Sequence, residues 1–310
     1  MINLKDRISG GLVGLLVGDA LGVPYEFHPP TDIPALTEIE LVPPKDFRRA
    51  HNVPPGTWSD DGAQALILLA SLNYSAKLDL DDFGRRLINW YDNGYMAVDN
   101  HVFDVGIQTS NAINRLEKGM APTESGLTSE TANGNGSLMR VLPLALWHMG
   151  TDEQLVADAQ RQSIVTHGHL RSQVCCALYC LWARCTLEGS GNAWSEAVSR
   201  LRRIYGEESL EHEELEWSIR PDDPTEGQGS GYVVDCLRSA RWAMNAGDYE
   251  QVVKAAISLG RDTDTTACVA GGIAGIRDGI DAIPERWRVQ LRGKELYEDE
   301  LEKLCRRRVK

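Results

Sequence analysis

Two acidic turns constrain this chain most, because each stands directly before a run of small and apolar residues. One is Arg261-Asp262-Thr263-Asp264-Thr265, followed by an Ala- and Gly-rich run, and the other is Ser59-Asp60-Asp61, followed by residues 63–72. Their carboxylates and hydroxyls are hard oxygen ligands that suit Mg²⁺, Mn²⁺ or Ca²⁺ better than zinc or copper. A simpler alternative is that Asp262 caps a helix and Asp264 is an ordinary first-turn acid.

The two turns lie about 200 residues apart, and a helical core could bring them face to face. Together they supply four carboxylates, which is more than one divalent ion needs to balance its charge. A pair of cations is therefore expected. Since both turns belong to one site, we expect a single domain over residues 1–310.

Charge excludes one class of partner. The net charge of −13 argues against sequence-independent binding of nucleic acid, which needs a basic face.

Asp19 interrupts the apolar segment near the N-terminus, no A-x-A cleavage pattern follows, and no uninterrupted apolar stretch is long enough to span a bilayer. Neither a signal peptide nor a membrane partner is expected.

The seven cysteines form an odd number and mostly lie in apolar helical patterns. This usage is typical of buried free thiols in a reducing cytosol, so a cytoplasmic location is expected. Cys176 and Cys180 are one helical turn apart, but neither a clustered histidine nor a second cysteine pair accompanies them. A zinc site is not expected there.

Hydrophobic periodicity predicts an all-α protein with one possible short extended piece at residues 37–42. Glycines recur every three or four residues in the first predicted helix, which indicates close contact with another helix. Long loops are expected at 29–55, 122–136 and 207–231. The predicted helices cover residues 4–21, 63–72, 82–91, 105–118, 138–149, 153–165, 170–187, 231–245 and 298–310, besides the one that follows Arg261-Asp262-Thr263-Asp264-Thr265.

Four further features have both a functional and a simpler interpretation. Glu26, in an apolar neighbourhood, is either a site contact or a surface acid. Asp104, judged by its position alone, is an N-cap. The glycines of residues 133–137 would let backbone N–H groups reach a phosphate or ribose, but such loops are also common for conformational reasons. For His169, at a predicted helix junction, capping is favoured over catalysis.

The motifs taken in order resemble those of the ADP-ribosylglycohydrolase family, which includes dinitrogenase-reductase-activating glycohydrolase and the vertebrate ADP-ribosylhydrolases. The resemblance covers nearly the whole chain. Its motifs are Gly18-Asp19-Ala20-Leu21-Gly22 with Glu26, Ser59-Asp60-Asp61, Gly134-Asn135-Gly136-Ser137-Leu138-Met139-Arg140, Thr166-His167, Arg261-Asp262-Thr263-Asp264-Thr265-Thr266 and Ile283-Pro284-Glu285-Arg286-Trp287.

The resemblance implies a compact all-α fold with a binuclear Mg²⁺ or Mn²⁺ centre at the bottom of a cleft. It also implies roles for particular residues. The metal ligands would be Ser59, Asp60, Asp61, Asp262, Asp264 and Thr265; the catalytic residues Glu26, Asp104 and Asp61; and the substrate contacts Asn135, Gly136, Ser137, His167 and Tyr232. Arg261, which is not the family's usual residue, is expected to place a cation next to the metals or the diphosphate and is counted as a further substrate contact.

The chain departs from the family pattern at a few positions. Ser59 and Gly62 replace the usual threonines around the aspartate pair, and Arg261 stands where glycine is usual. Ile107 and Gln108 differ from the polar residues that follow the corresponding acid in the nitrogen-fixation enzymes. These changes retain all the carboxylates and leave the substrate open.

We therefore expect a metal-dependent hydrolase that cleaves the bond at C1″ of ADP-ribose. Two cations would orient the ribose hydroxyls and lower the pKa of a bound water, while Glu26 or Asp104 handles protons. The partner would be an ADP-ribosylated protein or an ADP-ribose-containing small molecule. Its linkage, to arginine, serine, an acetyl ester, a nucleobase or a free derivative, stays open.

Two other functions are alternatives to hydrolysis. A non-catalytic family member that binds ADP-ribose or serves structurally would be expected to lose metal ligands, whereas this chain keeps every carboxylate. An all-α isoprenoid diphosphate enzyme would need a carboxylate one helical turn beyond the first pair, where Gln64 stands. Both are therefore disfavoured.

Overall fold

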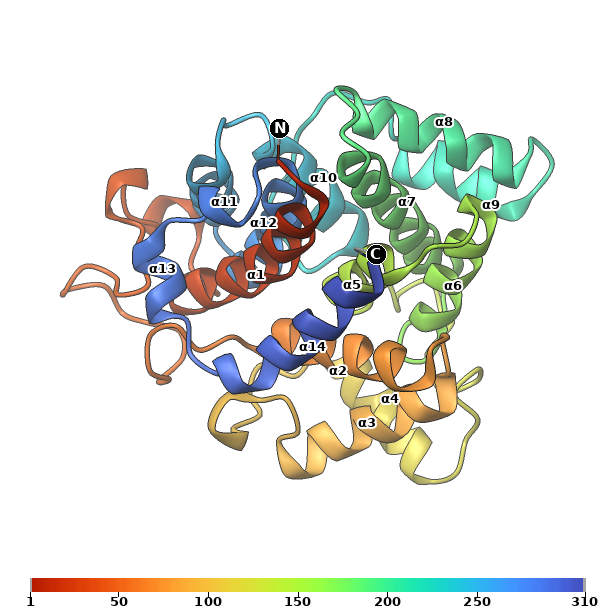
Figure 1. Ribbon diagram of the computed structural model, residues 1–310, viewed down its shortest axis with the longest axis horizontal. Helices are drawn as coiled ribbons and strands as arrows, with labels where there is room; N and C mark the ends of the chain where they lie inside the picture. Colours follow the sequence, from red (N-terminus) through yellow and green to blue (C-terminus); the bar gives the residue numbers. More distant parts are fainter. Residues whose placement is uncertain (1, 309–310) are drawn as a thin grey trace.

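The glycine-spaced segment near the N-terminus forms helix α1 (Leu4–Gly22), which lies against helix α12 (Thr263–Asp278). Figure 1 shows the two helices side by side. A Cβ atom on Gly10 would lie only 2.2 Å from the carbonyl oxygen of Gly275, and one on Gly18 would lie 2.2 Å from a backbone oxygen of α12. The two backbones are thus in direct contact, and only glycine permits this approach.

The computed structural model describes residues 2–308, and within them it is 63% helical with 14 α-helices and no strands. The all-α prediction is confirmed. The expected extended piece at 37–42 is wrong, since Leu36–Glu38 forms a 3₁₀ turn. Besides α1 and α12, the helices are α2 (Asp60–Ser75), α3 (Leu80–Asn93), α4 (Ile107–Glu117), α5 (Leu142–Trp147), α6 (Asp152–Ile164), α7 (Leu170–Leu187), α8 (Ala193–Tyr205), α9 (Leu210–Glu213), α10 (Val233–Ala243), α11 (Tyr249–Ser258), α13 (Glu285–Gln290) and α14 (Lys294–Arg308).

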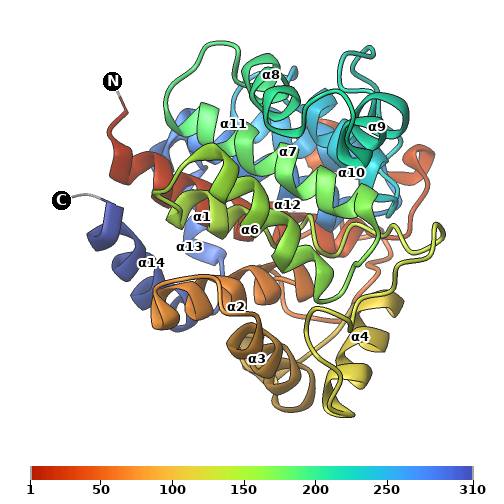
Figure 2. The same ribbon diagram turned by 90° about the vertical axis from the view of Figure 1, so that its right-hand side faces the viewer.

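The remaining helices surround this central pair. Helices α10 and α11 pack on α12, α7 packs between α6 and α8, and α14 packs on α2 and α1. In Figure 2, α2, α3 and α4 form the lower part of the molecule, while α1, α7 and α12 lie above them. The N-terminal ends of α2 and α12, which carry the two acidic turns, therefore belong to different layers.

Several predicted boundaries were wrong. Helix α4 begins at Ile107 with Gly106 as its N-cap, so Asp104 is not a helix cap. Residues 207–231 are not all loop, because α9 is followed by a π-helix at Glu214–Ile219. Helices α8 and α13 were not predicted, and residues 309–310 of the predicted C-terminal helix lie outside the described residues.

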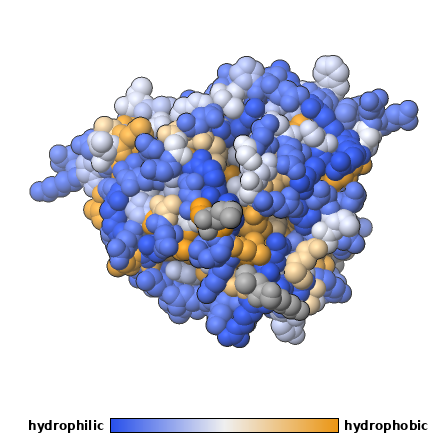
Figure 3. Space-filling model, turned by 45° about the horizontal axis from the view of Figure 1, so that its top comes forward, coloured by the Kyte–Doolittle hydropathy of each residue, from blue (hydrophilic) through white to orange (hydrophobic). Residues whose placement is uncertain are grey.

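Burial explains the apolar character of the first helix. Residues Leu4–Tyr25 are long and apolar enough to cross a membrane, which the sequence analysis did not expect, but the apolar 18-residue window within this segment is buried inside the protein. All seven cysteines are also buried, and within residues 2–308 each is a free thiol. On the face shown in Figure 3, hydrophobic residues lie in small separate groups among hydrophilic ones.

The contact between α1 and α12 makes a direct prediction. Gly10→Ala should lower the free energy of unfolding by about 1–3 kcal/mol, because the new methyl group meets backbone atoms that cannot rotate away. Chemical denaturation would measure the change. Gly191→Ala is the matched control, since a Cβ there has no heavy atom of residues 2–308 within 4 Å. Equal stabilities for the two variants would contradict the backbone contact.

Candidate active site

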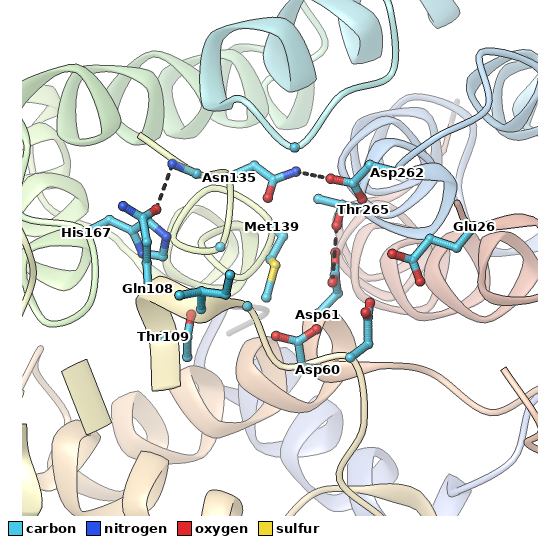
Figure 4. A pocket seen from close by; sticks show the side chains of 16 residues that line it. Glu26, Asp60, Asp61, Gln108, Thr109, Asn135, Met139, His167, Asp262 and Thr265 are labelled. Atoms are coloured by element: carbon cyan, nitrogen blue, oxygen red, sulfur yellow. Dashed lines mark hydrogen bonds between the residues drawn. The ribbon is translucent and has the colours of Figure 1, made fainter. Parts of the chain in front are cut away.

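The two acidic turns meet in the structure. Ser59 Oγ accepts a hydrogen bond from the Asp61 backbone N–H at 3.3 Å, and Thr265 Oγ1 donates to Asp61 Oδ2 at 3.4 Å. Figure 4 shows Asp60, Asp61, Thr265 and Asp262 gathered on one side of a cavity, with Glu26 beside them. The expectation that the clusters face each other is confirmed.

Several buried oxygens of this cluster have no hydrogen-bond partner among residues 2–308, namely Asp61 Oδ1 and both carboxylate oxygens of Asp264. Glu26, Asp262 and Asp264 each offer an oxygen within 4.8 Å of the others. Burial and mutual repulsion raise the pKa of Asp60, Asp61 and Asp264 well above the usual range. An unpartnered set of oxygen ligands with excess negative charge fits divalent cations.

Asp262 is not a simple helix cap. It occupies the N-cap position of α12, but its side chain makes no capping hydrogen bond. Instead its Oδ2 accepts from Asn135 Nδ2 at 2.8 Å. The capping alternative is therefore wrong for Asp262, whose carboxylate connects the acidic turn to the loop containing Asn135.

Asp19 holds the first acidic turn from behind, a role the sequence analysis missed. Its side chain is fully buried and accepts from the backbone N–H groups of Ser59 at 2.9 Å and Gly62 at 2.7 Å. A Cβ on Gly62 would lie 2.8 Å from the Trp58 ring, which explains the absence of the usual threonine there. The sequence feature that could have indicated this role is an acidic residue inside an apolar helix whose glycines recur every three or four residues.

A buried cation stands behind Asp60, and it was also missed. Gln64 Nε2 donates to Asp60 Oδ2 at 2.8 Å, and Gln64 Oε1 in turn accepts from Arg140 Nη1 at 2.9 Å. Arg140 is fully buried, and burial lowers its pKa to about 10. It therefore keeps its positive charge at neutral pH and offsets part of the negative charge of the cluster.

The opposite wall of the cavity is polar but not acidic. It is formed by Asn135, Gly136, His167, Gln108 and Thr109, and the cavity holds about 250 Å³. Burial lowers the pKa of His167 to about 3, so its ring is neutral, with Nδ1 2.7 Å from the neighbouring threonine hydroxyl. Figure 4 shows this wall facing the carboxylates. The cavity thus has one acidic and one neutral side.

Glu26 and Asp104 stand at the acidic end. Burial and the charges of Asp104 and Asp262 raise the pKa of Glu26 to about 11, and burial raises the pKa of Asp104. Asp104 adopts a left-handed backbone with φ of 59°, and so does Arg261 with φ of 62°. Such strain in residues other than glycine is characteristic of functional sites. A histidine that the sequence analysis did not consider, His51, contacts Glu26 at 2.5 Å.

Comparison with known proteins decides the family. The ADP-ribosylglycohydrolase family profile matches residues 1–310. The chain belongs to the ADP-ribosylglycohydrolase family. It is 32% identical to ADP-ribosylarginine hydrolase Tri1 of Serratia proteamaculans, over 91% of this chain and 74% of that protein.

Two further relatives agree with this assignment. The chain is 28% identical to the ADP-ribosyl-[dinitrogen reductase] glycohydrolase of Rhodospirillum rubrum, over 93% of this chain and 91% of that protein. A solved structure titled ADP-ribosylglycohydrolase-related protein complex superposes with a TM-score of 0.77 at 31% identity, covering 98% of each chain. The protein is thus an enzyme that hydrolyses a glycosidic bond of ADP-ribosyl groups.

Three predicted substrate contacts of this ADP-ribosylglycohydrolase do not line the cavity as residues 2–308 define it. Ser137 is fully buried and accepts from Ser163 Oγ at 2.8 Å. The Tyr232 hydroxyl accepts from Arg171 at 3.2 Å, and the Arg261 guanidinium donates to the backbone carbonyl of residue 228. Their substrate roles stay predictions.

The role of Asp19 is testable in this ADP-ribosylglycohydrolase. Asp19→Asn should lower the free energy of unfolding by roughly 1–3 kcal/mol, because an amide NH₂ would face a buried backbone N–H that has lost its acceptor. Urea denaturation of the metal-free protein measures it. Asp281→Asn serves as a surface control, since the Asp281 side chain is 91% exposed. Unchanged stability in Asp19→Asn would contradict the role.

Proposed function

We propose that this ADP-ribosylglycohydrolase removes ADP-ribose from arginine side chains and depends on two divalent cations, Mg²⁺ or Mn²⁺. The observation that carries the proposal is the convergence of Asp60, Asp61, Asp262 and Asp264 beside the acids Glu26 and Asp104, with three carboxylate oxygens that have no partner in the described part of the chain. A relative with 32% identity is named for ADP-ribosylarginine, which supports this linkage.

The cation ligands would come from both acidic turns. They are Ser59, Asp60, Asp61, Asp262, Asp264 and Thr265. When bound, the cations supply positive charge, orient the ribose hydroxyls and lower the pKa of a bound water. The protein's own part is to hold the oxygens in place: Asp19 fixes the first turn, and Asn135 fixes Asp262.

The acidic end of the cavity suits an arginine leaving group. Cleavage at C1″ builds positive, oxocarbenium-like character on the ribose while the leaving group departs. Glu26 and Asp104 lie side by side at this end, both largely buried, so a carboxyl group is at hand to transfer a proton to or from the departing group. A guanidinium group is a cation, so neighbouring carboxylates favour its binding at this end of the cavity.

The neutral wall suits the rest of ADP-ribose. Asn135, Gly136 and the uncharged ring of His167 offer hydrogen-bonding groups without adding negative charge near a diphosphate. The proposal concerns the linkage and not the carrier protein. Ile107, 79% exposed at the cavity edge, departs from the polar residue of the nitrogen-fixation enzymes, so a different carrier is expected.

A linkage panel tests the proposal. Arginine-, serine- and ester-linked ADP-ribose would each be incubated with the protein in Mg²⁺, in Mn²⁺ and in EDTA, and released ADP-ribose would be measured. We expect release from the arginine linkage with either cation and none in EDTA. Release from another linkage alone would overturn the substrate, and full activity in EDTA would overturn the metal dependence.

The proposed cation ligands give a second prediction. Asp60→Asn and Asp262→Asn, made separately, should each lower kcat by at least about 100-fold, because each removes a charged ligand. The far-UV circular dichroism spectrum should stay near normal. Asp281→Asn, at the exposed surface, should keep full activity. Retained turnover in either site variant would refute its assignment as a ligand.

A further inference from the structure

His51 connects the two acids at the edge of the cavity. Its Nε2 atom lies 2.5 Å from Glu26 Oε2 and 3.9 Å from Asp104 Oδ1. The Glu26 side chain is only 5% exposed, the Asp104 side chain 19% and the His51 side chain 16%. One imidazole nitrogen is thus within hydrogen-bonding distance of Glu26 and close to Asp104, the two groups proposed to handle protons.

The His51 ring is held in place from two sides. The Phe103 ring lies 5.1 Å away and the Phe27 ring 5.6 Å away, both tilted by 54°. The preceding residue, Ala50, donates its backbone N–H to the Pro24 carbonyl at 3.1 Å, which ties this loop to the segment carrying Glu26. The ring therefore has a fixed position relative to the carboxyl group.

The other end of the Glu26 segment is fixed as well. Phe27 donates its backbone N–H to the carbonyl of Arg261 at 2.6 Å, and Arg261 donates to the carbonyl of His28 at the same distance. Phe27 and Arg261 both have positive φ, of 62°. This pairing links the backbone around Glu26 to the acidic turn at Asp262, and the Glu26 side chain alone is left to be oriented.

We propose that His51 is a positioning residue for this hydrolysis. Its Nε2–H holds Glu26 Oε2, so that the other carboxyl oxygen of Glu26 faces the reacting ribose. This inference rests on the proposed function, because it assigns His51 a role in the same proton transfer. Proton transfer is faster when the acid or base is held within hydrogen-bonding distance of the proton and in the correct orientation.

The chemistry of the ring suits this role. Glu26 has to exchange a proton during turnover, and a permanently charged lysine or arginine would lock it as the ionised partner of a salt bridge. A neutral imidazole donates one hydrogen bond from Nε2 and leaves Nδ1 free to accept. His51 can therefore orient the carboxyl without fixing its protonation state.

Two matched variants separate the hydrogen bond from the packing. His51→Phe keeps an aromatic ring between Phe27 and Phe103 but removes the N–H. His51→Gln loses the ring but places an amide N–H at similar reach. With ADP-ribosylarginine and saturating Mg²⁺, we expect His51→Phe to lower kcat about 10- to 100-fold with KM within about 2-fold, and His51→Gln to keep most of kcat.

A second readout does not depend on turnover. Nitrogen-15 NMR of the histidine rings, with His51 identified by its loss in His51→Gln, should show the Nε2–H form in wild type. Glu26→Gln should shift the His51 Nε2 resonance without changing the ring nitrogens of His148, which lies on another part of the chain. An unshifted His51 resonance in Glu26→Gln would overturn the contact.

The kinetic outcomes distinguish this inference from the proposed function. A wild-type protein with no activity on any linkage refutes the proposed function itself. An active wild type with His51→Phe equally active refutes the role of His51 alone. Equal losses of kcat in His51→Phe and His51→Gln also refute it, because they show that packing rather than the N–H matters.

Discussion

The backbone contact between α1 and α12 is the constraint on which the rest of the structure depends. Glycines at every third or fourth position of α1 let the two helices touch along their length. In this position of α1, the Asp19 carboxylate accepts a hydrogen bond from the turn that precedes α2. The same contact places Asp264, at the start of α12, near the end of α1. Two acidic turns distant in sequence thereby share one buried space.

That space is electrostatically costly in the protein alone. Five carboxyl groups line the cavity, and burial and their mutual repulsion raise pKa values across the cluster. The fold offsets part of this cost with fixed hydrogen-bond donors. Backbone N–H groups donate to Asp19, the Asn135 amide donates to Asp262, and Gln64, itself bound to Arg140, donates to Asp60. The unpartnered oxygens that remain are those for which divalent cations are the natural counterions.

Much of this arrangement could be predicted from sequence because its signals are local. Hydrophobic periodicity predicted α7 with its observed bounds, and the acid-then-helix pattern identified both turns. His51 and Arg140 could not be assigned in this way, because their partners lie 25 and 76 residues away. Asp104 was misplaced for a similar reason: its position before a helix suggested a cap, whereas the helix begins three residues later.

The central claim is that the two acidic turns together form a site for two divalent cations. Equilibrium dialysis of the metal-stripped protein against Mn²⁺, with the bound metal counted per chain, tests it most directly. The account predicts a stoichiometry near two for the wild type and a lower value for Asp264→Asn. This substitution removes the carboxylate whose two oxygens are buried and have no hydrogen-bond partner among residues 2–308. No bound Mn²⁺ in the wild type, or an unchanged stoichiometry in the variant, would contradict it.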